Sequence, residues 1–330
     1  MGIGKVPKIT RRSFLQVSAG LTAAGIGIPR VVHARQPRGL ASIIDLTLCD
    51  GCPDKEIPAC VAACRNLYQE TVPDPVDPIP KLFPRGKIED WSKKKHVYDR
   101  LTPYNFIFVE KAEVEYEGKK FTLSIPRRCM HCDNPACATT CPFAANHKMK
   151  NGAVVINEHI CVGGAKCRTV CPWAIPQRQS GVGPYLNFAP TLVGNGVMYK
   201  CNLCYDLLLE DKAPACMEAC PTGAMIIGER DEILADARAR AACINGFIYG
   251  KDENGGTSTF YVSPVPFDII DKAIPHGAGL PHFKPAKRDM AKLSTWETWV
   301  MASPFVGIAA GVVGTFSILS KSKGGEGGEE

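Results

Sequence analysis

Apolar and polar side chains alternate over short stretches in the first half of the chain. These stretches are rich in β-branched and aromatic residues and cover 105–110, 112–118 and 119–126. Alternation with a period of two is typical of half-buried strands. Glu117-Gly118 separates the last two stretches, so we predict a β-hairpin there.

Turn and loop residues divide the rest of the chain. Asn151-Gly152 is a turn dipeptide, and it predicts that a strand begins in the apolar run at 153–157. Residues 71–100 are rich in Pro and charged residues and are predicted to form a loop excursion. Residues 251–295 contain several Pro and Gly residues and are predicted to form an irregular tether.

An uncharged apolar segment of 22 residues runs from Trp299 to Ser320. A helix needs about 20 such residues to span a bilayer. Trp296 lies at one edge as interfacial aromatics do, and Lys321 and Lys323 follow the other edge. We therefore predict a transmembrane helix at 299–320 with a cytoplasmic tail. The alternative is a buried core helix, but no polar stripe interrupts the segment.

The N-terminal residues have the layout of an export signal. Arg11-Arg12 is followed by a weakly apolar Gly/Ala-rich run and then by small residues around Ala34. This order is typical of a twin-arginine leader, which we predict over 1–34. The alternative is the basic start of an ordinary short helix.

The chain has far more cysteine than is usual, and any function assigned to it must explain this content. The chain has 330 residues, 16 Cys and a formal net charge of +6. Its length suggests about two domains. The positive charge is diffuse and forms no Lys/Arg stripe with interleaved aromatics, which argues against nucleic-acid binding. We also find no nucleotide-binding fingerprint, P-loop or catalytic triad.

Fifteen of the cysteines form an internal repeat, with Cys243 left outside it. Each complete repeat has a tight Cys pair, a variable spacer and a Cys-x3-Cys step, and this step is followed by Pro in all groups but the first. The groups are Cys49, Cys52, Cys60 and Cys64; Cys129, Cys132, Cys137 and Cys141; Cys161, Cys167 and Cys171; and Cys201, Cys204, Cys216 and Cys220. The third group lacks one thiol, because Gly164 occupies the position of its second Cys.

Three kinds of chemistry could explain this repeat. Disulfides are common in exported chains, but they do not require the same spacing four times. Structural zinc favours two Cys-x2-Cys pairs, and the second step here is different. Bacterial ferredoxins use Cys-x2-Cys-x2-Cys-x3-Cys-Pro, in which the fourth Cys serves a neighbouring cluster. The spacing therefore favours iron–sulfur clusters.

Residues 45–230 resemble the four-cluster iron–sulfur subunits of bacterial respiratory oxidoreductases. That family includes subunits of formate dehydrogenase-N, dimethyl sulfoxide reductase, nitrate reductase and polysulfide reductase. The stretch "YKCNLCYDLLLEDKAPACMEACPTGAMIIG" is especially similar to its fourth group. The exported, tail-anchored layout is similar to the electron-transfer subunit of hydrogenase-2.

The resemblance implies an α+β fold with two pseudo-symmetric ferredoxin-like dicluster modules, a β-hairpin insertion and one C-terminal transmembrane helix. The expected parts are a leader at 1–34, a module at 45–64 with 198–230, an insertion at 65–127, a second module at 128–197, an extension and tether at 231–295, and an anchor at 299–320. Arg65 departs from the family pattern, because Pro would follow the last Cys of the first group.

The resemblance also implies which cysteines share a cluster. The four sets are Cys49, Cys52, Cys60 and Cys220 (set I); Cys64, Cys201, Cys204 and Cys216 (set II); Cys129, Cys132, Cys137 and Cys171 (set III); and Cys141, Cys161 and Cys167 (set IV). Sets I to III are expected to hold [4Fe-4S] clusters. Set IV has three thiols and is expected to hold a [3Fe-4S] cluster.

Two alternatives stay open for set IV. It could hold a [4Fe-4S] cluster with a non-Cys ligand, for which Glu158 or His159 could reach in from before the loop. It could also be a degenerate site with no cluster. A cluster lacking one iron should lie towards the high end of the potentials available to such centres, roughly −700 to +450 mV.

The expected function is electron relay without catalysis by the chain itself. Expected partners are a periplasmic catalytic subunit of hydrogenase or molybdopterin type, or a multihaem cytochrome c, and an integral membrane quinone-interacting subunit. The expected location is the periplasmic side of the inner membrane. The rival hypothesis is a self-contained oxidoreductase with an open iron beside Gly164.

Four further residues are expected to have supporting roles or none. His131 lies inside the Cys129–Cys132 loop and is expected to donate a hydrogen bond rather than to bind metal. Phe143 and Trp173 are expected to shield clusters from water. Cys243 is expected to be a buried thiol on a helix.

Overall fold

The computed structural model describes residues 39–84 and 86–284. The predicted leader at 1–34 and the predicted transmembrane helix at 299–320 lie outside these residues. Within the described part, no helix is long and apolar enough to cross a membrane.

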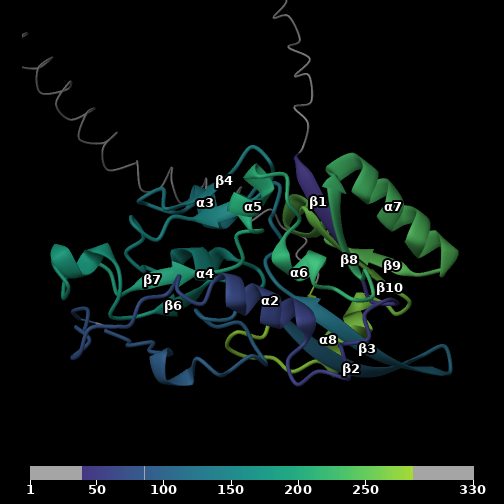
Figure 1. Cartoon of the computed structure of the whole chain (residues 1–330), viewed down its shortest axis with the longest axis horizontal. Coiled ribbons are helices and arrows are strands. Elements are labelled where there is room, and N and C mark those ends of the chain that lie inside the picture. Colours follow the sequence, from purple (N-terminus) through teal and green to yellow (C-terminus); the bar gives the residue numbers. More distant parts are fainter. Residues whose placement is uncertain (1–38, 85, 285–330) are drawn as a thin grey trace, which may run out of the picture. The chain divides into compact units, whose positions relative to one another are not determined.

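A mixed four-stranded sheet joins segments far apart in the sequence (Figure 1). Its strands, in spatial order, are β8 (Met225–Glu229), β1 (Leu40–Asp45), β10 (Thr259–Ser263) and β9 (Phe247–Tyr249). β1 and β10 are parallel, and the other two pairs are antiparallel. β1 is buried along nearly its whole length because it is an inner strand with both faces covered.

Helix α7 (Arg230–Cys243) covers one face of this sheet (Figure 1). It buries Ile233, Ala237 and Ala241, which recur every four residues and so lie on one side of the helix. Cys243 follows Ala241 by two residues and therefore points away from that side. Its side chain is exposed, so the expectation of a buried thiol is wrong, although its position on a helix is confirmed.

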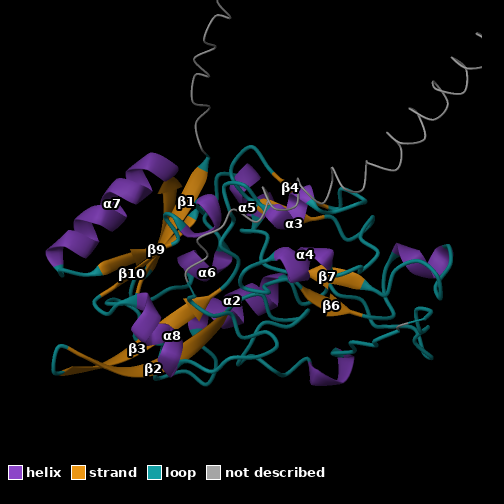
Figure 2. Ribbon diagram, turned by 180° about the vertical axis from the view of Figure 1, so that it is seen from behind, coloured by secondary structure: helices purple, strands orange, loops and turns teal. Residues whose placement is uncertain are grey.

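The predicted hairpin is present as β2 (Phe108–Tyr116) and β3 (Lys119–Arg127) (Figure 2). Glu117 and Gly118 both have positive φ, as the tight two-residue turn between twisted strands requires. Helix α8 (Phe267–Ala273) packs against β2.

The expected irregular tether at 251–295 is wrong over part of its length. Both β10 and α8 lie within it, and β10 is an inner strand of the sheet. The short 3₁₀ helix η3 (Glu253–Gly255) precedes them. Pro and Gly in this segment mark the turns between elements rather than continuous irregular chain.

Two small ribbons support the cysteine loops. One pairs β4 (Asn146–Lys148) with β5 (Val154–Ile156), which confirms the strand predicted after the Asn-Gly turn. The other pairs β6 (Gln177–Gln179) with β7 (Val197–Tyr199). The 3₁₀ helix η2 (Pro184–Asn187) lies in the segment that connects β6 to β7. The only helix in the predicted loop excursion, as far as the structure describes it, is the 3₁₀ helix η1 (Ser92–Lys94).

Short helices lie beside the cysteines. They are α2 (Ala59–Leu67), α3 (Ala136–Thr139), α4 (Lys166–Val170), α5 (Tyr205–Leu209) and α6 (Ala215–Glu218). In α2, α3 and α6 a Pro precedes the first helical residue, and a Cys is the second. Pro disfavours helix in the residue before it but not in those after it, so each helix starts at a defined point relative to its Cys. The mixture of short helices and strands agrees with the predicted α+β class.

Candidate metal-cluster site

All sixteen cysteines lie in the described residues, and all are free thiols. No disulfide joins them, so a disulfide-stapled scaffold does not describe this structure. Among the residues described, no three His, Cys, Asp or Glu side chains are close enough to hold a single metal ion. The thiols instead surround shared spaces between loops.

The thiols of set I come together from the two ends of the repeat region. Cys49, Cys52, Cys60 and Cys220 line one small cavity with Pro58 and Pro221. Three of these thiols come from the first group and one from the fourth.

Sets II and III are brought together in the same interleaved way. The Cys64 thiol lies within electrostatic range of Cys201, Cys204 and Cys216, although more than 130 residues separate them in the chain. In set III, the Cys132 thiol lies within electrostatic range of Cys129, Cys137 and Cys171. In both sets one thiol comes from a distant group.

Set IV surrounds a cavity of about 150 Å³. Cys141, Cys161 and Cys167 line it, and so does Gly164. The other lining residues are Pro142, Phe143, Ala145, Val162, Gly163, Ala165, Lys166 and Met198. Glu158 and His159 are not among them. Met198 was not expected from the sequence; its backbone N–H donates to the Cys161 sulfur at 3.4 Å.

Backbone geometry identifies Gly164 as the counterpart of a ligand. The residue before the second Cys has positive φ in each complete group, namely Gly51, His131 and Leu203. In the third group Gly163 has positive φ, lies two residues after Cys161 as Gly51 lies after Cys49, and directly precedes Gly164. Ala165 also has positive φ. Gly164 therefore occupies the structural position of Cys52, Cys132 and Cys204.

The two neighbouring glycines differ in the space around them. A side chain at Gly163 would have its Cβ 2.5 Å from the carbonyl oxygen of Gly196, and φ there is +69°. A Cβ at Gly164 would meet nothing within 4 Å, and no unusual φ is required there. The turn therefore requires glycine at 163. The backbone does not require glycine at 164, and its effect there is that set IV has no fourth thiol.

The loops that carry Pro after their last Cys end in a similar way. In the last three groups the chain turns through a positive φ three residues after that Cys, at Ala144, Ala174 and Gly223. Arg65 replaces Pro in the first group, and there α2 continues to Leu67. The Arg65 guanidinium donates to the carbonyl oxygens of Lys95 and Val97, which joins this longer helix to the loop before the hairpin.

Pairs of thiols from different sets place the sets in a row. Cys60 of set I lies near Cys216 of set II. Cys201 of set II lies near Cys129 of set III. Cys137 of set III lies near Cys167 of set IV. The order I, II, III, IV follows from these three adjacencies.

Burial makes the free thiols poor acids. It raises the pKa of Cys49 and Cys137 to about 11, and of Cys171 and Cys216 to about 12. Thiolate is the form that binds metal, so iron must displace these protons. The buried thiols therefore suit a cationic group that compensates their charge.

Two buried cations lie next to the thiol sets and were not expected from the sequence. Arg128 precedes Cys129, is almost fully buried and donates to Ser42, Thr259 and the Cys129 carbonyl. Burial raises the pKa of Cys201 and Cys216 in the neighbouring set, and the charge of Arg128 offsets part of that rise. Lys200 precedes Cys201, and its charge offsets part of the rise that burial gives to the pKa of Cys137. Each cation is thus adjacent in sequence to a thiol of one set and acts on the thiols of the next.

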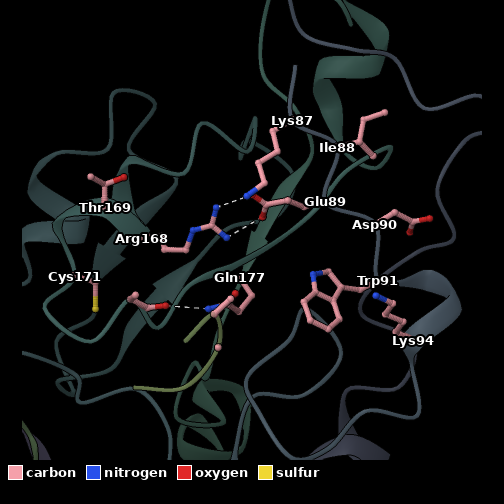
Figure 3. A pocket seen from close by; sticks show the side chains of 13 residues that line it. Lys87, Ile88, Glu89, Asp90, Trp91, Lys94, Arg168, Thr169, Cys171 and Gln177 are labelled. Atoms are coloured by element: carbon pink, nitrogen blue, oxygen red, sulfur yellow. Dashed lines mark hydrogen bonds and ion pairs between the residues drawn. The ribbon is translucent and has the colours of Figure 1, made fainter. Parts of the chain in front are cut away.

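An open cavity of about 650 Å³ lies beside Cys171 (Figure 3). On one wall Arg168 forms a two-pronged pair with Glu89, both bonds being 2.8 Å, and Arg178 also donates to Glu89 at 2.9 Å. These arginines lower the pKa of Glu89 against the effect of its burial. The cavity shows that the loop excursion at 71–100 packs on the third cysteine group.

The two aromatic residues expected to shield clusters differ in exposure. Phe143 lines the set IV cavity but is about half exposed. Trp173 is buried, and its indole N–H donates to the Tyr249 hydroxyl at 2.8 Å. Trp173 therefore joins the third group to β9.

The residues present fit iron–sulfur clusters. Four sets of converging thiols are free of disulfides, and N–H groups are directed at several of their sulfurs. Examples are Leu203 N–H to Cys201 and the Asn254 amide to Cys132, both at 3.4 Å. Such donors compensate the negative charge of a thiolate-bound cluster.

Comparison with known families gives two matches in this region. Both are described as a 4Fe-4S dicluster domain, and they cover residues 120–230 and 48–145. Together the two matches include all fifteen grouped cysteines.

Several known proteins are similar to this chain. The hydrogenase-2 operon protein HybA of Escherichia coli O157:H7 is 28% identical over 308 residues, covering 80% of this chain and 83% of that protein. The iron-sulfur subunit of the nitrate-inducible formate dehydrogenase of Escherichia coli K12 is 31% identical over 235 residues, covering 68% and 67%. The B subunit of the anaerobic dimethyl sulfoxide reductase of the same strain is 38% identical over 105 residues, covering 32% and 45%.

Proposed function

The chain belongs to the family of iron–sulfur electron-transfer subunits of bacterial respiratory oxidoreductases, and from that premise we propose that it relays single electrons between two partner proteins. The observation that carries this proposal is the row of four thiol sets. A thiol of each set lies near a thiol of the next set. The chain therefore offers a continuous series of sites rather than isolated ones.

The proposed cofactors are three [4Fe-4S] clusters in sets I to III and one [3Fe-4S] cluster in set IV. Each cluster, when bound, accepts and releases one electron at a potential that depends on its surroundings. The chain supplies the thiol ligands, the N–H donors and the buried charges of Arg128 and Lys200. The grouped thiols are buried or half-buried, which limits the access of water to the sites.

The proposed setting is the periplasmic side of the inner membrane. It rests on the twin-arginine pattern in 1–34 and on the uncharged segment at 299–320, both outside the described residues. We propose that sets I and II face a periplasmic catalytic subunit of hydrogenase or molybdopterin type, or a multihaem cytochrome c. Sets III and IV would then lie nearer an integral membrane subunit that exchanges electrons with quinone.

A rival function is a self-contained oxidoreductase that binds its substrate at set IV. The cavity beside Gly164 favours this rival, because space there is lined by three thiols rather than four. We expect the isolated chain to show no turnover with artificial electron carriers in the presence of hydrogen, formate or dimethyl sulfoxide. Turnover by the isolated chain would favour the rival.

The proposal predicts that anaerobically purified protein is brown and contains iron and acid-labile sulfide. The oxidised protein should also show the paramagnetic signal of a [3Fe-4S] cluster, and stepwise reduction should add signals from [4Fe-4S] clusters. Metal analysis and electron paramagnetic resonance (EPR) would measure both. A colourless, folded protein without iron would refute the function.

A matched pair of cysteine variants tests which thiols bind iron. Cys216→Ser removes a ligand of set II and should abolish or alter one [4Fe-4S] signal. Cys243→Ser should leave iron content and every EPR signal unchanged, because this thiol is exposed at the end of α7. Loss of a cluster in the Cys243 variant would contradict the assignment of ligands.

A further inference from the structure

His131 lies in the tight loop of one thiol set but interacts with a sulfur of another. It stands between Cys129 and Cys132 of set III and is fully buried. Its ring nitrogen Nδ1 accepts a hydrogen bond from the backbone N–H of Val154 at 2.9 Å. A backbone N–H can only donate, so Nδ1 carries no proton. In a neutral ring the proton is therefore on Nε2.

The Nε2 atom lies 3.6 Å from the sulfur of Cys201, which belongs to set II. With the proton on Nε2, this contact is an N–H···S hydrogen bond. The Cys201 sulfur also accepts from the backbone N–H of Leu203 at 3.4 Å. Leu203 belongs to the same loop as Cys201, so its bond is local, whereas the bond from His131 crosses between two sets.

The surroundings of His131 hold its ring in the donating orientation. β5 fixes the direction of the ring, because Val154 belongs to the ribbon formed by β4 and β5. The donor is thus held by a strand and not by a flexible contact.

We propose that His131 is a positioning residue that raises the reduction potential of the set II centre through Cys201 and joins sets II and III by one hydrogen bond. This inference rests on the proposed function. The physical reason is electrostatic: a donor to a thiolate stabilises the more negative, reduced form more than the oxidised form. The bond also gives electrons a short bonded route from the loop of set III to a ligand of set II.

Replacing the histidine tests the effect on potential. His131→Leu removes the donor and should shift the reduction equilibrium of the set II centre about tenfold towards the oxidised form, or about 59 mV lower for one electron. His131→Gln should recover most of the shift, since its amide can donate from a similar distance. His147→Leu, on the adjoining strand β4, is the matched control and should leave all potentials unchanged. Potentials are read from EPR-monitored redox titrations.

A spectroscopic readout on the unmodified sequence avoids dependence on how the variants fold. In protein labelled with ¹⁵N-histidine, pulsed EPR of the unmodified chain should detect histidine nitrogen coupled to one reduced [4Fe-4S] centre. That coupling should persist in His147→Leu and vanish in His131→Gln. Assembled clusters with no histidine coupling, or potentials indifferent to His131, would overturn this inference alone. Absence of clusters from every form would overturn the proposed function instead.

Discussion

Replacing Gly164 by cysteine is expected to convert the set IV centre from [3Fe-4S] to [4Fe-4S]. The new thiol would stand where Cys52, Cys132 and Cys204 stand in the other groups, and so would supply the missing fourth ligand. The oxidised variant should lose the paramagnetic signal of the [3Fe-4S] cluster, and its iron content should rise by one atom per chain. The potential of the centre should also fall, within the span of roughly −700 to +450 mV open to such clusters.

The structure explains why this substitution should be tolerated. Nothing lies within 4 Å of a Cβ at Gly164, so the side chain enters open space beside the three existing thiols. The loop itself is fixed by its neighbours: the Gly163 carbonyl accepts from Arg178 at 3.0 Å, and the Val162 carbonyl accepts from Asn195 N–H at 2.8 Å. A fixed loop presents the added sulfur without rearrangement.

Two controls distinguish the effect of an added iron ligand from the effect of added side-chain volume. Gly164→Ala adds a Cβ without sulfur and should retain the [3Fe-4S] signal. Gly163→Ala should disrupt the loop, because its Cβ would lie 2.5 Å from the Gly196 backbone. An unchanged signal in Gly164→Cys would show that this position does not face the open corner. Absence of the signal from the parent protein would refute the assignment of set IV.

The features that the sequence predicted well depend on local geometry. Two thiols separated by two residues must share a tight turn, and the positive φ before the second Cys of each complete group, and before Gly164 in the third, shows that turn repeated. The hairpin was likewise encoded locally, by alternation on both sides of Glu117-Gly118. The sets themselves join distant groups, so their composition came from family resemblance and not from spacing.

The features that the sequence did not predict depend on long-range packing. β10 is a five-residue strand, and its parallel pairing with β1 joins residues more than 200 positions apart. No local pattern signals such a partner. Arg128 and Lys200 are ordinary basic residues in the sequence, and only the fold shows that each is buried beside the thiols of a neighbouring set. Cys243 was misplaced because a helix of mostly small and charged residues gave a weak indication of its buried side.

Arg127→Met is expected to cause the largest loss of stability of any single change considered. Arg127 and Glu110 form an ion pair at 3.2 Å with both side chains almost completely buried. The guanidinium also donates to the His282 carbonyl at 3.1 Å and stacks 3.8 Å from the centre of the Phe283 ring. It therefore joins the hairpin to the last described residues. Breaking a buried pair from one side costs about 3–5 kcal/mol, which should lower the melting temperature by roughly 10 °C.

The loss should depend on pH in a defined direction. Burial raises the pKa of Glu110 to about 7, and Arg127 opposes that rise. A carboxyl whose pKa is higher in the folded chain than its ordinary 4.5 favours folding when protonated, so this contribution is lost as pH rises through about 7. Without Arg127 the pKa rises further. The difference in melting temperature between parent and variant should therefore be greater at pH 8 than at pH 6.

A double variant separates the ion pair from the packing around it. Arg127→Met combined with Glu110→Leu leaves no unpaired charge and should recover most of the lost stability, because apolar replacement of a whole buried pair is often nearly neutral. It should also remove the pH dependence of the loss. Melting followed by the visible absorbance of the clusters measures all three proteins under one set of conditions. Equal melting temperatures for the parent and the Arg127 variant at pH 8 would show that this pair does not stabilise the junction, because the buried carboxylate would then be tolerated without its cation.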